Sequence, residues 1–242
     1  MVPDPSRNIF VAGAGGAIGS VLCRLLLHDG WHVSGTTRSA QRAAELRSIG
    51  VLPVIVDVFD RQALIAAVVH AQPHVVVHQL TDLPKTFSPE AMPAARARNA
   101  RIREIGTDNL VAAALQAGAR RMVAQSIAFA YAEGPKPYLE DAPLDHASGA
   151  AVAKLETLVL GSPSLHGIVL RYGRLYGPRT WSEAPSGEAP VHVDAAADAA
   201  RRAVTRGAAG IYNIAEEDGV VSSGKARREL GWSSQFRSLL QG

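Results

Sequence analysis

Four glycines near the amino terminus have a spacing suited to binding phosphate. Residues 10–20 read FVAGAGGAIGS, so Gly13-x-x-Gly16-x-x-Gly19 follows a short apolar run and opens a helical pattern. Glycine is needed where a turn takes positive φ, where a side chain would block a pyrophosphate, and where helix and strand pack closely. The helix start also offers unpaired N–H groups and a partial positive charge. We therefore expect these glycines, with Ala17 and Ile18, to bind a dinucleotide.

The residues at the end of the second predicted strand indicate which dinucleotide the chain binds. Thr36, Thr37 and Arg38 stand there, where NAD-dependent proteins tend to place an acidic residue for the ribose 2′-hydroxyl. Arg38 could instead pair with a 2′-phosphate through its planar guanidinium. The sequence thus favours NADP(H) over NAD(H), with Thr37 and Arg38 as ligands. The alternative for Arg38 is a solvated side chain at a helix start.

Strand and helix patterns alternate along the chain. Apolar runs predict strands at 8–12, 31–37, 51–57, 74–80, 120–126, 167–173 and 210–215. Helical patterns at 17–30, 41–50, 61–71, 93–117, 148–160 and 194–207 separate most of them. This alternation predicts an α/β protein with a Rossmann-type, doubly wound, mostly parallel sheet of about seven strands.

We expect one domain over residues 1–242. Its cofactor-binding part would comprise about 1–172 and 208–216, and a reduced substrate-binding part about 173–207 and 217–242. Irregular segments follow the fifth and sixth strands, where sheets of this kind bind ligands. Asp57 ends the third strand, where it could accept a hydrogen bond from adenine or cap a helix, and both alternatives stay open.

Composition narrows the classes of partner. There are 25 Lys and Arg against 22 Asp and Glu, with the arginines dispersed, so nucleic acid is not an expected partner. Cys23 is the single cysteine, which excludes an intramolecular disulfide. We see neither a signal-peptide pattern nor a membrane span, and expect a cytoplasmic protein without a metal.

With these motifs in hand, the chain resembles the extended short-chain dehydrogenase/reductase family of NAD(P)-dependent epimerases, dehydratases and reductases. The resemblance rests on GAGGAIG, VDVFD, VVHQL, GTDNLVAAALQAG, Ser126 and LRYGRLYGP, and covers most of the chain. It implies that Asp57, Val58, Gln79, Leu80 and Arg103 lie at the cofactor, although Arg103 stands where the family often has Asn.

The family uses a Tyr-x-x-x-Lys pair with a Ser for proton transfer. Lys154 is the only lysine on the corresponding helix, and Ala150 stands four residues before it. Matching Glu156 to the family's acidic residue instead puts Ser148 and Val152 at the pair positions. The tyrosine is missing in either register, so the chain is an atypical member.

We take Ser126, Lys154 and Tyr131 as candidate catalytic residues, and Tyr138, His146, Tyr172 and Tyr176 as other proton donors. Tyr131 and Tyr176 also match family positions that carry Tyr for packing. Trp181, in the shortened segment after the sixth strand, either faces substrate or covers the core.

These observations predict an NADP-dependent reductase that moves hydride to a carbonyl, imine or activated alkene of a small organic substrate. The alternatives are an NAD(P)-binding sensor without turnover and a sugar epimerase or dehydratase. The resemblance also implies a homodimer through the long helix and the helix that carries Ala150, Ala151 and Ala153, whose small side chains allow close packing.

Overall fold

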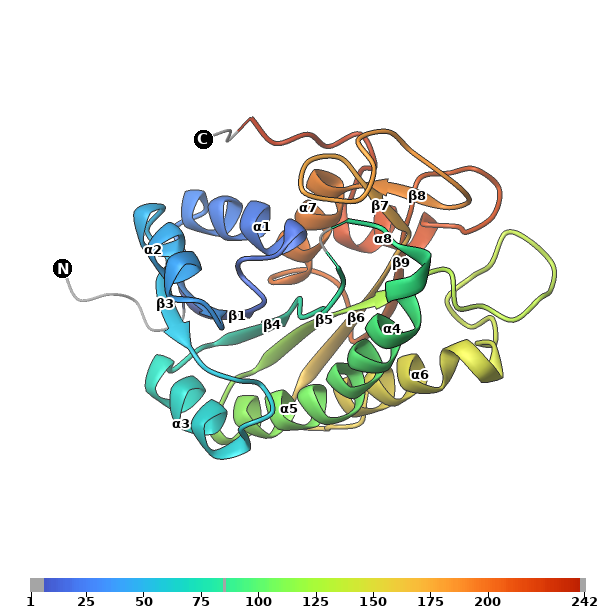
Figure 1. Ribbon diagram of the computed structural model, residues 1–242. Coiled ribbons are helices and arrows are strands. Elements are labelled where there is room, and N and C mark those ends of the chain that lie inside the picture. The colour runs from blue at the N-terminus through green and yellow to red at the C-terminus, as the bar shows by residue number, and fades with distance from the viewer. Residues whose placement is uncertain (1–6, 85, 240–242) are drawn as a thin grey trace.

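The computed structural model describes residues 7–84 and 86–239 and contains one seven-stranded parallel sheet (Figure 1). The strand order is β3-β2-β1-β4-β5-β6-β9. The strands are β1 Asn8–Ala12, β2 His32–Thr37, β3 Leu52–Ile55, β4 Val75–His78, β5 Arg121–Ile127, β6 His166–Tyr172 and β9 Gly210–Ile214. The predicted Rossmann-type fold is confirmed.

The central strands are buried on both faces. Every residue of β4 is buried, as are the last four of β1, which suits the continuous apolar runs of parallel sheets. The chain moves outward from β1 through β2 to β3, then returns to β4 on the other side of β1. A crevice at the carboxyl ends of β1 and β4 is the expected ligand position in such a topology.

Helices cover both faces of the sheet (Figure 1). One core cluster joins one face to α1 and α7, and a second joins the other face to α3, α5 and α6. The helices are α1 Ala17–His28, α2 Ala40–Ser48, α3 Arg61–Ala71, α4 Met92–Arg101, α5 Thr107–Gln116, α6 His146–Leu160, α7 Val193–Ala203 and α8 Gly224–Leu230.

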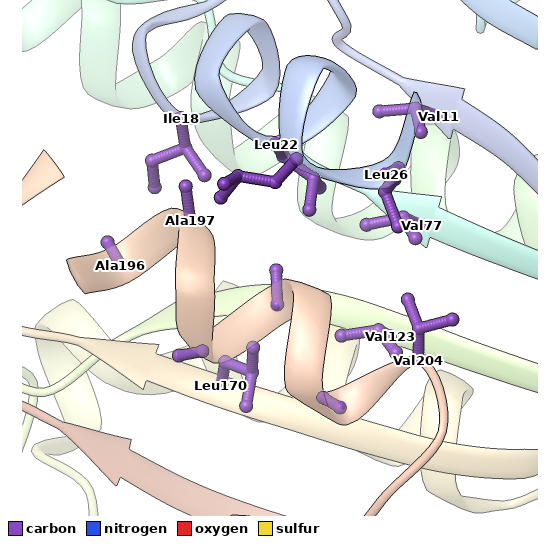
Figure 2. Close-up of a cluster of buried hydrophobic side chains, with 14 of the residues drawn as sticks. Val11, Ile18, Leu22, Leu26, Val77, Val123, Leu170, Ala196, Ala197 and Val204 are labelled. Atoms are coloured by element: carbon purple, nitrogen blue, oxygen red, sulfur yellow. The ribbon is translucent and has the colours of Figure 1, made fainter. Parts of the chain in front are cut away.

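The contact between α1 and α7 depends on small side chains (Figure 2). Ile18 and Leu22 of α1 lie opposite Ala196 and Ala197 of α7. All four are buried, and the alanines let the helix axis of α7 approach closely. This contact fixes the start of α1, and therefore the glycine turn, relative to the sheet.

The predicted helical stretch over 93–117 is present but is not one uninterrupted α-helix. It is divided into α4 and α5 by a π-helical turn, Ile102–Gly106. At this turn Thr107 Oγ1 donates to Ile102 O at 3.3 Å, and a Cβ on Gly106 would lie 3.4 Å from the Val58 side chain. The sequence also did not predict α8 or the short strand β7 Arg174–Tyr176, which pairs with β8 Pro190–His192.

No helix among the described residues is long and apolar enough to cross a membrane. The domain boundaries and the homodimer stay predictions, although Ala150 and Ala153 are exposed on α6 as an interface of close-packed helices would need.

Candidate dinucleotide site

A hollow of about 380 Å³ opens at the carboxyl ends of β1, β2, β3 and β4. Eight of the predicted cofactor residues line it: Gly13, Gly16, Thr37, Arg38, Asp57, Val58, Gln79 and Leu80. Gly15 of the glycine turn also lines it, as do Ser39, Arg42, Phe59 and Thr81, which the sequence had not singled out. Strands far apart in sequence thus bring their predicted ligands to one place.

Two glycines of the turn have no room for a side chain. Gly13 has φ +91°, and a Cβ there would lie 2.5 Å from the carbonyl oxygen of Gln79. A Cβ on Gly19 would lie 2.1 Å from the carbonyl oxygen of Gly13, so this glycine allows α1 to pack on the turn. Gly16 is the N-cap of α1 and has no side chain to bond the first N–H groups, which are available to an anion.

Ala17 and Ile18 form the first turn of α1 but do not line the hollow. Ile18 is 5% exposed and belongs to the core. Any contact that these two residues make with a ligand would go through their backbone N–H groups.

Two guanidinium groups flank the end of β2. The Arg38 side chain is 67% exposed, and its Nη1 lies 3.8 Å from Asp82 Oδ2. Such a solvated ion pair contributes little, so Arg38 can turn to another anion at low cost. Arg42 lies one helical turn later on α2, whose N-cap Ser39 accepts from the Arg42 N–H at 3.4 Å. Thr37, Arg38 and Arg42 therefore suit a phosphate on the ribose.

Asp57 is not a helix cap. The N-cap of α3 is Asp60, which accepts from the Ala63 N–H at 3.0 Å. Asp57 Oδ1 accepts from the Phe59 N–H at 3.0 Å, which holds the carboxylate at the edge of the hollow. Its role as an acceptor for adenine stays a prediction.

Gln79 carries an unused polar atom. The residue is 4% exposed, and its Nε2 donates to the Tyr172 hydroxyl at 3.4 Å. Its Oε1 is buried and has no hydrogen-bond partner among the described residues. A buried oxygen without a hydrogen-bond partner lowers the stability of the fold. Because Gln79 lines the hollow, a bound ligand that carries a hydrogen-bond donor would supply the partner for Oε1. The residues present thus fit a dinucleotide.

Ser126 takes part in a buried ionic cluster. Its Oγ donates to Glu156 Oε1 at 2.9 Å, and Arg171 donates to both oxygens of Glu156, at 2.8 and 2.7 Å. Both charged side chains are less than a tenth exposed. Glu156 therefore occupies the inward face of α6, together with the buried Val152.

The three candidate catalytic residues do not meet at the hollow. Lys154 is exposed on α6, on a different face from the buried Val152 and Glu156. Tyr131 donates to Asn213 Oδ1 at 2.6 Å and stacks on Tyr138 at 5.0 Å between ring centroids. None of Ser126, Lys154 and Tyr131 lines the hollow.

The other predicted proton donors are also engaged or distant. The Tyr176 hydroxyl donates to Glu216 at 2.6 Å, the Tyr138 hydroxyl accepts from the Gly134 N–H, and His146 is exposed. Burial raises the pKa of Tyr172 well above its ordinary value, so this phenol stays neutral and is a poor acid.

Arg103 lies in the π-helical turn and is partly buried. Burial lowers its pKa, and the charge of Glu156 opposes that shift. Arg103 does not line the hollow, although its neighbour Ile102 does, so its contact with a cofactor stays a prediction.

The segment after β7 reaches across the site. Arg179 Nη2 donates to the Gly15 carbonyl at 3.0 Å. Trp181 Nε1 donates to the Pro84 carbonyl at 2.8 Å, and its ring contacts Phe87 edge to face at 5.4 Å. Trp181 is 41% exposed, so it joins two loops beside the hollow rather than covering the core. In the described part of the chain, no group of His, Cys, Asp and Glu could hold a metal ion.

Sequence comparison agrees with this geometry. The profile of the NAD dependent epimerase/dehydratase family matches residues 9–235. The chain belongs to this family. It is also 43% identical over 239 residues to a 3-diazoavenalumate denitrifying reductase from Streptomyces sp, covering 87% of this chain and 76% of that protein. It is 32% identical over 181 residues to the 2-alkyl-3-oxoalkanoate reductase of Stenotrophomonas maltophilia, covering 71% and 52%.

Solved structures confirm the fold. UDP-glucose 4-epimerase from Thermotoga maritima superposes with a TM-score of 0.78 at 19% identity, covering 95% of this chain and 94% of that one. UDP-glucuronic acid 4-epimerase from Bacillus cereus, in complex with NAD, gives 0.72 at 18%, covering 95% and 94%. Membership of this family and the similarity to two reductases identify the chain as an NAD(P)-dependent oxidoreductase that acts on a small molecule.

Proposed function

We propose that the protein is an NADPH-dependent reductase whose substrate is a small organic molecule that carries a carboxylate. The group of the substrate that accepts the hydride takes no proton from a protein side chain. One observation carries this proposal. The side chains that could supply a proton near the carboxyl ends of β5 and β6 are engaged or face away: Ser126 donates to Glu156, Tyr131 donates to Asn213, and Lys154 is exposed on a different face of α6 from the buried Glu156.

The preference for NADPH is supported by the end of β2. Arg38 and Arg42 border the hollow together with Thr37. None of the residues lining this end of the hollow, Thr36, Thr37, Arg38 and Ser39, is a carboxylate that would hold a free 2′-hydroxyl and repel a phosphate.

The nature of the acceptor follows from the proton balance. Hydride addition to a carbonyl leaves an alkoxide, which must take a proton from a nearby acid. Imines and conjugated alkenes, which the sequence also suggested, need less help. An aryl diazonium ion needs none, because hydride neutralises the cation and the resulting aryldiazene loses N₂ as its hydrogen passes to the ring carbon.

The name of the Streptomyces relative supports this acceptor, and the names of both relatives support a carboxylate on the substrate. The name of the Streptomyces relative includes a diazo group and denitrifying reduction, and both relatives are named for carboxylates. When bound, reduced nicotinamide supplies the hydride, so one NADPH and one aryl diazonium ion would give one arene, one N₂ and one NADP⁺.

The test compares two acceptors on the same ring. With 4-carboxybenzenediazonium we expect NADPH oxidation above the protein-free rate, with one N₂ and one benzoate per NADPH. With 4-carboxybenzaldehyde we expect no oxidation. Reduction of the aldehyde but not the diazonium ion would contradict the proposal, as would a rate equal to that without protein.

A further inference from the structure

A cation and an aromatic ring stand together at the carboxyl ends of β5 and β6. Ile127 and Tyr172 are paired at the ends of these adjacent strands. Phe129 and Arg174 each follow two residues later. The Arg174 guanidinium lies over the Phe129 ring, 4.8 Å from its centroid. Both residues are exposed, Phe129 by 47%.

The backbone nearby leaves space for the Arg174 side chain. Gly187 has φ +70°, and a Cβ there would lie 3.1 Å from Arg174 Cδ and 3.3 Å from Nε. The stem of Arg174 is therefore held between the Phe129 ring and the backbone of the segment after β7. Such support limits the rotamers that Arg174 can adopt and so lowers the entropy cost of binding.

Arg174 differs from the other arginines at this edge. Arg171 is bound to Glu156, and Arg179 donates to Gly15. Within residues 7–84 and 86–239, no carboxylate forms an ion pair with Arg174. Its guanidinium thus keeps its donors for an anion, for which carboxylate has matching bidentate geometry.

The strand that precedes Arg174 contacts the dinucleotide site. Tyr172, two residues before Arg174, accepts a hydrogen bond from Gln79, which lines the hollow. The hollow spans β1 to β4, and a ligand extending past β4 along the carboxyl edge reaches β5 and β6 next. A substrate would lie there, at the far end of the dinucleotide from its adenine.

We infer that Arg174 binds the carboxylate of the substrate and that Phe129 stacks on its planar, unsaturated part. The inference rests on the carboxylate substrate proposed above. It names the substrate class more narrowly, as an aromatic or conjugated carboxylic acid.

The test measures binding of (E)-cinnamate and of its neutral methyl ester to the protein saturated with NADP⁺, by isothermal titration calorimetry. We expect cinnamate to bind at least tenfold more tightly than the ester. Arg174→Gln should remove this difference by weakening cinnamate about tenfold, and Phe129→Leu should weaken both probes.

The matched control is Arg120→Gln. Arg120 is also exposed, but it immediately precedes β5 and so lies at the opposite edge of the sheet. Its replacement should leave both affinities unchanged. Equal binding of acid and ester to the unmodified protein overturns the inference, as does unchanged cinnamate binding in Arg174→Gln. The inference also fails if Arg103→Gln removes the difference in affinity between acid and ester while Arg174→Gln does not.

These outcomes are separate from those of the proposed function. Failure to reduce 4-carboxybenzenediazonium, together with Arg174-dependent binding of cinnamate, would remove the proposed reaction and leave the carboxylate site. Reduction of the diazonium ion with unchanged affinity in Arg174→Gln would remove only the site.

Discussion

At the scale of single residues, cofactor preference is expected to depend on two guanidinium groups. Arg38 and Arg42 border the same end of the hollow, and a hydrogen bond to a charged partner contributes about 1.5–3 kcal/mol. Arg38→Ala or Arg42→Ala should therefore weaken NADPH about tenfold to a hundredfold and leave NADH unchanged, measured by nicotinamide fluorescence. Arg47→Ala, exposed at the other end of α2, serves as the control. Tight binding of NADH to the unmodified protein would contradict this prediction.

Residues differ in how much of their role the sequence could predict. Gly16 and Gly19 were predictable because their constraint is local to one turn and helix, and Gly13 because its positive φ is local, although its close contact with Gln79 is not. Arg42 was missed, although its spacing of four from Arg38 would have placed it on the adjacent helical turn. The partners of Ser126 lie 30 and 45 residues later in the chain, so no local pattern indicated that its hydroxyl is bound in a buried cluster.

At the scale of elements, α6 is held to β5 and β6 by the pair Glu156 and Arg171. Glu156→Gln would leave a buried guanidinium without a counter-charge, which costs about 3–5 kcal/mol. We expect that decrease in the free energy of unfolding, measured by urea titration with circular dichroism. Replacing both residues by Met should restore much of the loss, since buried ion pairs often add little net stability.

A surface pair with the same separation provides the control for this measurement. Arg61 and Asp108 are also 2.7 Å apart, but both are about half exposed. Asp108→Asn should cost less than about 1 kcal/mol. Equal losses for Asp108→Asn and Glu156→Gln would show that burial of the pair does not matter.

The elements that the sequence did not predict are short or depend on distant contacts. β7 and β8 have three residues each and pair only with one another. The π-helical turn lies where the helix meets Val58 and where Thr107 faces His78. Helical periodicity continues through that turn, so the pattern alone indicated one long helix.

At the scale of the whole molecule, His78 couples stability to pH. Its ring is buried, Nδ1 accepts from the Leu80 N–H at 3.2 Å, and Nε2 lies 3.0 Å from Thr107 Oγ1. A neutral imidazole protonated on Nε2 satisfies both contacts. Burial, with the charge of Arg103, lowers the pKa of His78 from 6.5 to about 4.

The sign of the pH effect follows from this shift. Between pH 6.5 and 4 the unfolded chain binds a proton at His78 and the folded chain does not. The stability that neutral His78 provides is therefore complete above pH 6.5 and is lost as the pH falls toward 4, by about 3 kcal/mol in all.

Carboxylates also titrate in the lower part of this range, so the contribution of His78 must be isolated by substitution. His78→Gln should flatten the decline in the free energy of unfolding between pH 6.5 and 4.5, measured by urea titration at several pH values. His70→Gln, exposed on α3, should decline as the unmodified protein does, and equal slopes in all three proteins would mean that His78 does not set this dependence.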